Sequence, residues 1–267
     1  MGKLTYEISR LRFYIKKVLK KHKYTVEGDV RCLVNEISKN GFAVVQNFYT
    51  EQECFLLREE LDKLIEKRIN ENTVWIDKAA SDYRCFGAED DSNLIARFHN
   101  DKFLNAVADN YFRAKMTCSN TLAAKIIYKD NNIGSGQGWH RDGNQLQFKA
   151  LIYLSDVEYK DGPFQIFSGS HKRLNILKHI ELMRYDGKNT RFTNEQIEKI
   201  MRDTPEQYKI LMGKAGTVVL FDSSTIHAGL PLSAGGGRYA LTNYYMPSYE
   251  DVNAQRNVFM NAHKKQK

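Results

Sequence analysis

Apolar residues recur every three or four positions along residues 4–19, a spacing that predicts an amphipathic helix. A second helix is indicated after Thr50, which forms a capping-box pattern with Glu53 ahead of a regular apolar stripe. A third is expected over residues 101–113. Residues 41–49 are short, β-branched and aromatic, and they predict a strand.

The pattern changes at Thr121, where strand-like runs replace helical stripes. Five runs separated by turn-rich pieces occupy residues 121–128, 148–157, 163–168, 216–221 and 238–246. Such a succession is typical of an antiparallel sandwich or barrel. Residues 172–212 interrupt it with helical signals, including capping-box patterns that begin at Thr193 and Thr204.

The chain shows no internal repeat and no low-complexity linker. We therefore predict a basic amphipathic helix in residues 1–23, followed by a single domain in residues 24–267 that carries the insertion 172–212. We expect that insertion to cover the functional site and to order when substrate binds, although a rigid packing element would have the same sequence.

The net charge of +8 is concentrated at the N-terminus. Eight basic residues and one acidic residue among the first 23 give +7, which leaves +1 for the other 244 residues. A surface that tracks nucleic-acid phosphates needs basic residues spread over the fold, so a nucleic-acid partner is not favoured. Hydrophobic residues make up 42% of the chain, enough for a sizeable core.

The first helix allows two interpretations. Its apolar stripe either packs on the body of the protein or lies on an anionic membrane, with the basic residues of 3–23 at the lipid surface. Arg10 and Arg12 interrupt any secretory signal, and the four widely spaced cysteines suit reduced thiols. We expect a cytoplasmic protein, peripheral to a membrane in the second interpretation.

The segment of residues 138–143, GWHRDG, contains the most informative side chains. In a strand, His140 and Asp142 point to the same face and can present an imidazole and a carboxylate to one point. His227 follows the last part of the sheet region and offers a third ligand. Two histidines and one carboxylate form the facial triad of non-haem Fe(II) oxygenases. The pair alone is a weak signal that also fits a hydrogen-bonded surface pair.

Arg238 opens a strand eleven residues after His227. A buried guanidinium there needs a planar anion, and the distal carboxylate of 2-oxoglutarate is a natural partner. A salt bridge to an acidic side chain is the alternative.

Taken in order, these features resemble the phytanoyl-CoA dioxygenase family of Fe(II)/2-oxoglutarate oxygenases. The resemblance rests on NGFAVVQNFYTEQEC, the Trp-His-x-Asp of 139–142, DGPFQIFSGSH of 161–171, GTVVLFDSSTIHAG of 216–229, and Arg238. It implies a mixed α and β fold with a double-stranded β-helix (jelly-roll, cupin-like) core, flanking N-terminal helices and a helical insertion. The family often has proline where this chain has Ser168, a change expected to affect a turn only.

The resemblance also implies roles for individual residues. His140, Asp142 and His227 would bind Fe(II), and Arg238 would hold 2-oxoglutarate, with O2 as the oxidant. One or two further contacts to the cosubstrate are expected among residues near the flanking strands, namely Lys125, Tyr128, Gln137 and Lys149, with a solvated strand edge as the alternative for the lysines. His171 is a weaker candidate than His227 for the third ligand, and it is expected to lie in a turn or beside the ligands without binding the metal.

The expected activity is hydroxylation of a small molecule of lipid, sugar or metabolite type, with release of succinate and CO2. Related halogenases lack the carboxylate supplied here by Asp142, whereas desaturation, epoxidation and ring closure use the same iron centre. The alternatives are a jelly-roll binding protein without turnover and an oxygenase of peptides or nucleic acids.

Overall fold

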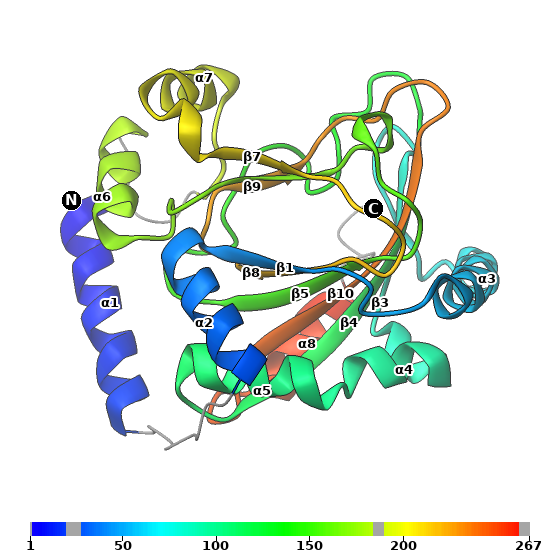
Figure 1. The fold of residues 1–267 in the computed structure, drawn as a ribbon, viewed down its shortest axis with the longest axis horizontal. Helices are drawn as coiled ribbons and strands as arrows, with labels where there is room; N and C mark the ends of the chain where they lie inside the picture. Colours follow the sequence, from blue (N-terminus) through cyan, green and yellow to red (C-terminus); the bar gives the residue numbers. More distant parts are fainter. Residues whose placement is uncertain (1, 20–27, 184–189, 262–267) are drawn as a thin grey trace.

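The computed structural model describes residues 2–19, 28–183 and 190–261, which form two antiparallel sheets surrounded by helices (Figure 1). The larger sheet contains, in chain order, β1 (Phe42–Val45), β2 (Trp75–Ile76), β3 (Asp82–Phe86), β4 (Met116–Ile127), β5 (Phe148–Tyr153), β8 (Val218–Asp222) and β10 (Gly237–Pro247). The smaller sheet contains β6 (Phe164–Phe167), β7 (Tyr208–Leu211) and β9 (His227–Gly229).

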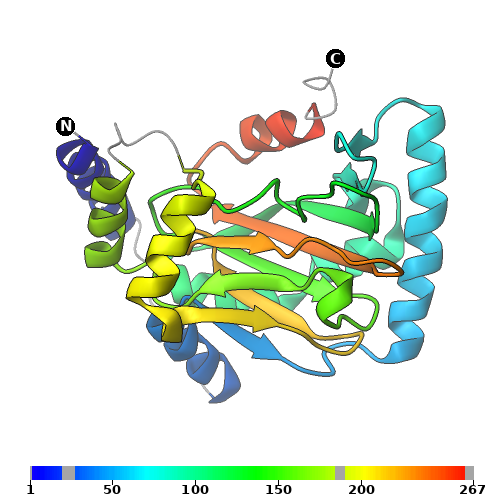
Figure 2. The ribbon, with the colours of Figure 1, turned by 90° about the horizontal axis from the view of Figure 1, so that it is seen from above.

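The two sheets face each other as the layers of a jelly roll (Figures 1 and 2). The strand order is β1-β8-β5-β10-β4-β3-β2 in the larger sheet and β7-β6-β9 in the smaller one. Five of these eight neighbouring pairs join strands that are not consecutive in the chain, and all of the pairs are antiparallel. The expected mixed α and β fold with a double-stranded β-helix core is confirmed.

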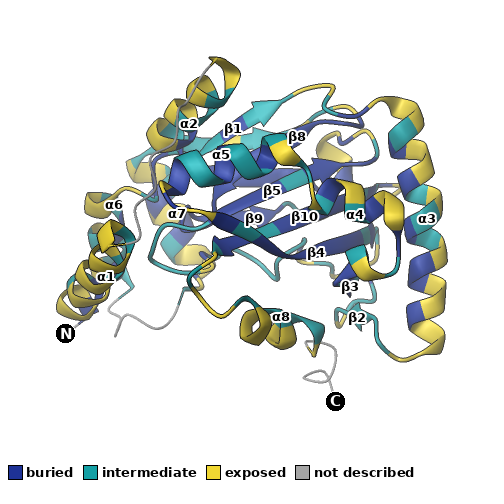
Figure 3. Cartoon of the chain, turned by 90° about the horizontal axis from the view of Figure 1, so that it is seen from below, coloured by how far each residue is buried: buried dark blue, intermediate teal, exposed yellow. Residues whose placement is uncertain are grey.

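Helices cover the larger sheet on the face away from the smaller one (Figure 1). The helices of the described residues are α1 (Gly2–Leu19), α2 (Gly28–Asn40), α3 (Glu51–Asn70), α4 (Asn93–His99), α5 (Lys102–Phe112), α6 (Arg173–Leu182), α7 (Asn194–Asp203) and α8 (Val252–Met260). Helices α2, α4 and α5 lie under the sheet, whereas α1 and α6 stand at one end of the molecule and α3 at the other (Figures 1 and 3).

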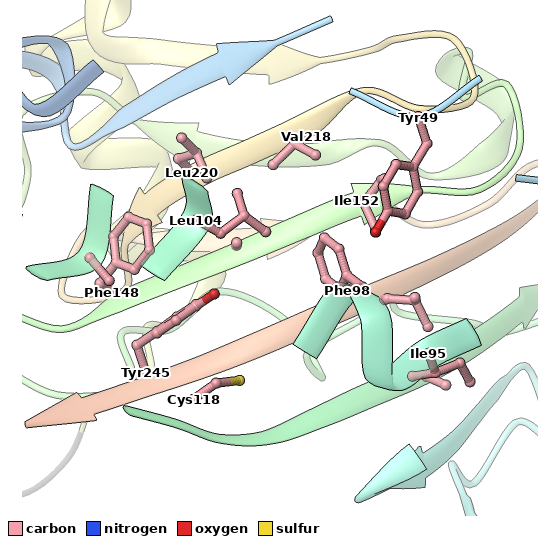
Figure 4. Packing of buried hydrophobic residues seen from close by; sticks show 14 of the residues in the cluster. Tyr49, Ile95, Phe98, Leu104, Cys118, Phe148, Ile152, Val218, Leu220 and Tyr245 are labelled. Atoms are coloured by element: carbon pink, nitrogen blue, oxygen red, sulfur yellow. The ribbon is translucent and has the colours of Figure 1, made fainter. Parts of the chain in front are cut away.

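Strand β8 shows how this layering follows from the sequence. Val218 and Leu220 belong to the main core between the larger sheet and the helices (Figure 4), whereas Val219 and Phe221 pack with Phe164 between the two sheets. Side chains alternate along a strand, so a strand covered on both faces must be apolar at every position. Each of these buried side chains contributes about 1.5–3 kcal/mol to folding.

Two of the predicted capping boxes are confirmed. The amide of Glu53 donates to Thr50 Oγ1 at 3.2 Å, and the amide of Gln196 donates to Thr193 Oγ1 at 3.3 Å. The third is wrong, because Thr204 Oγ1 donates to the carbonyl of Ile200 and only a single 3₁₀ turn follows.

The insertion is less helical than predicted. Residues 208–211 form strand β7, which pairs with β6 along its whole length, so the helical part ends before Tyr208. The predicted strand 41–49 is shortened to β1, since Asn47 adopts a left-handed φ of 53°. The strand predicted to begin at Thr121 is β4, which begins five residues earlier, at Met116. Helices α2, α4 and α8 and strands β2 and β3 were not predicted.

Helix α1 confirms the predicted N-terminal helix and bears on the two interpretations of its apolar stripe. Tyr6 is buried against α6, whereas the stripe that includes Leu11 and Val18 is exposed. The interpretation that places this stripe against the body is therefore wrong for the described residues. No helix in the described part of the chain is long and apolar enough to cross a membrane.

Candidate metal centre

Two histidines are placed opposite each other by their own backbones. The amide of His140 donates to the carbonyl of His227 at 3.0 Å, and the amide of His227 donates back to the carbonyl of His140 at 2.9 Å. Such a reciprocal pair fixes the two side chains side by side on one face. Their ring centroids lie 4.4 Å apart.

Asp142 joins them because it lies two residues after His140 in the same extended segment. Its amide donates to the carbonyl of Ser223 at 3.0 Å. Asp142 Oδ1 lies 3.6 Å from His140 Nε2, and one ligand atom from each of the three residues lies within 4.8 Å of the others. The segment is an irregular piece with isolated bridges and not a full strand, but the alternation predicted for it holds locally.

Hydrogen bonds leave one nitrogen of each imidazole available. His140 Nδ1 lies 2.9 Å from the carbonyl of Gly138, and His227 Nδ1 lies 2.8 Å from the carbonyl of Thr225. A carbonyl only accepts, so each Nδ1 carries the proton and each Nε2 keeps its lone pair. Burial lowers the pKa of His227 to about 3 and also lowers that of His140, so both rings are neutral at pH 7.

The carboxylate of Asp142 is held by a lysine on β5. Lys149 Nζ lies 2.5 Å from Asp142 Oδ2, the oxygen other than the one near His140. Burial alone would raise the pKa of Asp142, but Lys149 and the two imidazoles hold it well below its usual range. Two neutral imidazoles and one ionised carboxylate on one face are the ligand set that non-haem Fe(II) takes.

The three candidate ligands line a cavity of about 600 Å³ between the two sheets. Arg238, on β10, lines the same cavity and is only 3% exposed. Its Nη1 donates to the carbonyl of Gly162, whereas its Nε is buried without a hydrogen-bond partner.

The guanidinium of Arg238 is poorly compensated. The carboxylate whose charge acts on it, Asp82, is hydrogen-bonded to Arg84 instead. Burial accordingly lowers the pKa of Arg238, with only Tyr153 and Asp82 acting against it. A buried cation with an unused donor, facing the candidate metal ligands across one cavity, suits the distal carboxylate of 2-oxoglutarate.

The other predicted cosubstrate contacts divide into two groups. Gln137 and Lys149 line the cavity, and Gln137 Nε2 is buried without a partner. Lys125 and Tyr128 do not line it, since Lys125 binds Asp62 of α3 at 2.7 Å and the hydroxyl of Tyr128 donates to Asp130. The structure therefore separates Lys125 and Tyr128 from the site.

The segment that carries His140 and Asp142 is also held by the insertion, which sequence patterns did not indicate. The amide of Arg141 donates to the carbonyl of Thr190 at 2.8 Å, and the amide of Phe192 donates to the carbonyl of Trp139 at 3.0 Å. The insertion thus pairs with the segment that carries His140. Thr190 also lines the cavity, so this part of the insertion forms a wall.

A further wall of the cavity comes from the β2–β3 hairpin and α8, which the sequence patterns did not predict. Trp75 and Arg84 of the β2–β3 hairpin line the cavity, together with Phe259 of α8. The rings of Phe86 and Phe259 are stacked with centroids 5.8 Å apart, which joins the hairpin to α8.

The family model described as phytanoyl-CoA dioxygenase (PhyH) matches residues 37–240. The chain belongs to this family. This dioxygenase is therefore an enzyme of the Fe(II)- and 2-oxoglutarate-dependent class that uses O2, and the predicted recognition and cofactors are confirmed.

Individual relatives of this dioxygenase are distant. An ectoine dioxygenase of Stutzerimonas stutzeri (strain A1501) is 23% identical over 212 residues, which cover 73% of this chain and 69% of the relative. The crystal structure of EctD from S. alaskensis with bound Fe has a TM-score of 0.64 at 15% identity, covering 85% of this chain and 81% of that one. HygX from Streptomyces hygroscopicus, with nickel and 2-oxoglutarate bound, has a TM-score of 0.60 at 17% identity, covering 82% and 87%.

Removing one candidate ligand should abolish the metal site. Anaerobic protein given Fe(II) and 2-oxoglutarate should show the visible absorption of a 2-oxo acid chelated to iron, and His140→Ala, Asp142→Ala and His227→Ala should each lose it. His171→Ala is the control that should retain it, because His171 does not line the cavity. Retention of the absorption by all three ligand variants would contradict the assignment.

Replacing Arg238 by leucine should weaken cosubstrate binding selectively. A charge-assisted bidentate contact is worth about 1.5–3 kcal/mol, so the affinity for 2-oxoglutarate should fall about 10- to 150-fold. Titration of the cosubstrate in the presence of Fe(II) measures this, and iron binding should stay close to wild type. Unchanged 2-oxoglutarate affinity would remove Arg238 from the site.

Replacing Lys149 by methionine should destabilise the metal-free protein by about 1–3 kcal/mol, because Asp142 loses its paired cation. Fe(II) should then raise the thermal midpoint of the variant more than that of the wild type, since the metal restores a cation beside Asp142. Lys125→Met removes a lysine whose ion pair, at 2.7 Å against 2.5 Å for Lys149, lies outside the cavity, and it is the matched control. An equal Fe(II) effect in both variants would contradict a role for Lys149 at the site.

Proposed function

We propose that this protein hydroxylates a small-molecule substrate. One atom of O2 enters a C–H bond of the substrate as a hydroxyl group, and the other enters succinate as 2-oxoglutarate loses CO2. His140, Asp142 and His227 would hold the Fe(II) that supplies the oxidising chemistry. Arg238 would bind the distal carboxylate of the cosubstrate, with Gln137 as a further contact.

The single observation that carries this proposal is the shared cavity. The three ligand atoms and the buried, incompletely bonded Arg238 line one space between the sheets. The carboxylate of Asp142 favours hydroxylation over halogenation, which needs that position for a halide. We also propose that residues 24–267 act as one catalytic domain, because the insertion forms backbone hydrogen bonds with the segment carrying His140.

The cavity supports a small substrate that is polar or anionic. Its volume of about 600 Å³ lies within the range of about 300–1,000 Å³ typical of small-molecule sites. Among the described lining residues Asp142 is the one acidic residue, whereas the cationic residues are Arg84, Arg141, Lys149, Arg191 and Arg238. Arg84 is paired with Asp82 and Lys149 with Asp142. Such an excess attracts anionic ligands. The named relatives also concern small molecules, ectoine in one case and hygromycin B in another.

The competing functions make different demands on the same protein. A jelly-roll binding protein would hold ligands without turnover, whereas an oxygenase of peptides or nucleic acids would accept a polymer. Outside residues 1–23 the chain carries a net charge of only +1, which disfavours a nucleic-acid substrate.

Succinate formation distinguishes these possibilities. The Fe(II)-loaded protein should release succinate from 2-oxoglutarate under air, and a substrate from a panel of small carboxylic, phosphorylated and zwitterionic compounds should accelerate it. Peptides and oligonucleotides complete the panel, and Asp142→Ala gives the background. Acceleration by a polymer alone would replace the small-molecule proposal. Succinate that never exceeds the background, in protein shown to bind iron and 2-oxoglutarate, would favour the binding protein.

A further inference from the structure

Helix α1 has a packed face and an exposed face on opposite sides. Tyr6 is buried with Ile176 and Ile180 of α6. About two turns further along the same face, Phe13 makes an edge contact with Phe112 of α5, with ring centroids 5.5 Å apart. Ion pairs from Lys3 and Glu7 of α1 to α6 reinforce this contact. The helix is thus attached to the body without using its aliphatic residues.

The opposite face carries an aliphatic stripe that belongs to no core cluster of the described residues and stays largely exposed. Its residues are spaced three and four apart and form a line along the helix. They are Leu4 (65% exposed), Ile8 (45%), Leu11 (62%), Ile15 (51%), Val18 (66%) and Leu19 (77%). Figure 3 shows the outward side of α1 largely in the colour of exposed residues, at the edge of the molecule.

Exposed apolar side chains are concentrated on α1. Of the sixteen exposed large hydrophobic side chains among the described residues, seven lie in α1 alone. Single exposed apolar residues need no explanation, but a contiguous line of them marks an interaction surface.

The charges around the stripe identify the kind of partner. On the helix circumference Arg12 and Lys16 flank one side of the stripe, and Lys16 is paired with Glu250 at 3.3 Å. Glu7 and Lys3 lie on the other side, and both are paired with residues of α6. The sequence continues with Lys20, Lys21 and further basic residues. Two copies of this helix meeting along the stripe would bring like charges together, which is unfavourable. A surface with anionic groups above an apolar interior matches both features of the helix.

We propose that α1 binds the surface of an anionic phospholipid bilayer. The aliphatic stripe enters the boundary between headgroups and acyl chains. Arg12, together with the positive charge of the basic residues that follow the helix in the sequence, attracts the lipid phosphates. Helix α1 packs on α6, which is the first helix of the insertion. The same insertion lines the cavity at Thr190. A bilayer bound by α1 would therefore hold the catalytic body in a fixed orientation. This proposal does not depend on the reaction catalysed.

Co-sedimentation of the full-length protein with vesicles tests the proposal. Vesicles of phosphatidylglycerol and phosphatidylcholine in equal parts should bind the protein at low salt and should bind less of it at physiological salt. Vesicles of pure phosphatidylcholine should bind it weakly. The double substitution Leu11→Ser with Ile15→Ser should lower the partition coefficient about a hundredfold, since two aliphatic side chains no longer leave water. Both residues are exposed, so the fold should be retained.

Phe55→Ser with Leu56→Ser is the matched control. Both residues are 45% exposed on α3, at the other end of the molecule from α1 (Figure 1). This control should bind vesicles as the wild type does. Equal binding by the α1 variant and the control, or binding that ignores lipid charge, would overturn the proposal. A second result would also overturn it: no vesicle binding by the wild type, together with a wild-type dimer in sedimentation equilibrium that the α1 variant does not form. The stripe would then join two copies of the protein.

Discussion

The reciprocal hydrogen bonds between the backbones of His140 and His227 are the constraint on which the rest of the site depends. They join an irregular segment to the smaller sheet, so two ligands far apart in sequence become neighbours before any metal binds. The segment is held on its other side by Thr190 and Phe192, and at Asp142 by Ser223. A ligand set fixed in this way loses little conformational entropy when it takes up a metal.

Much of this arrangement could be predicted from local sequence. The alternation that places His140 and Asp142 on one face needs only extended backbone, and it survives although the segment is not a regular strand. Strand β8 was recognisable because burial on both faces requires an uninterrupted apolar run. The capping box at Thr50 was predictable because its two hydrogen bonds join residues only three positions apart. Each of these features depends on near neighbours in the chain.

The features that escaped prediction depend on distant partners. Residues 208–211 carry no decisive local preference and become a strand because the edge of β6 is available to them. Lys125 and Lys149 are both strand lysines, yet one meets Asp62 outside the sheet and the other meets Asp142 inside the cavity. The face on which α1 packs was also hidden, because its periodic aliphatic stripe lies opposite to the aromatic residues that make the contact. Periodicity shows that a helix has two faces but not which of them the body covers.

The stacked pair Phe86 and Phe259 joins two segments that form one part of the cavity lining. One part of this lining belongs to the strands and paired segments that carry the candidate iron ligands, and the other belongs to a short hairpin and a C-terminal helix joined by this stack. Changes in the hairpin or the helix can reshape the space around a substrate while the backbone pairing of the ligands stays intact. The shape of the substrate space is thereby separated in the fold from the placement of the candidate iron ligands, so a change in one need not disturb the other.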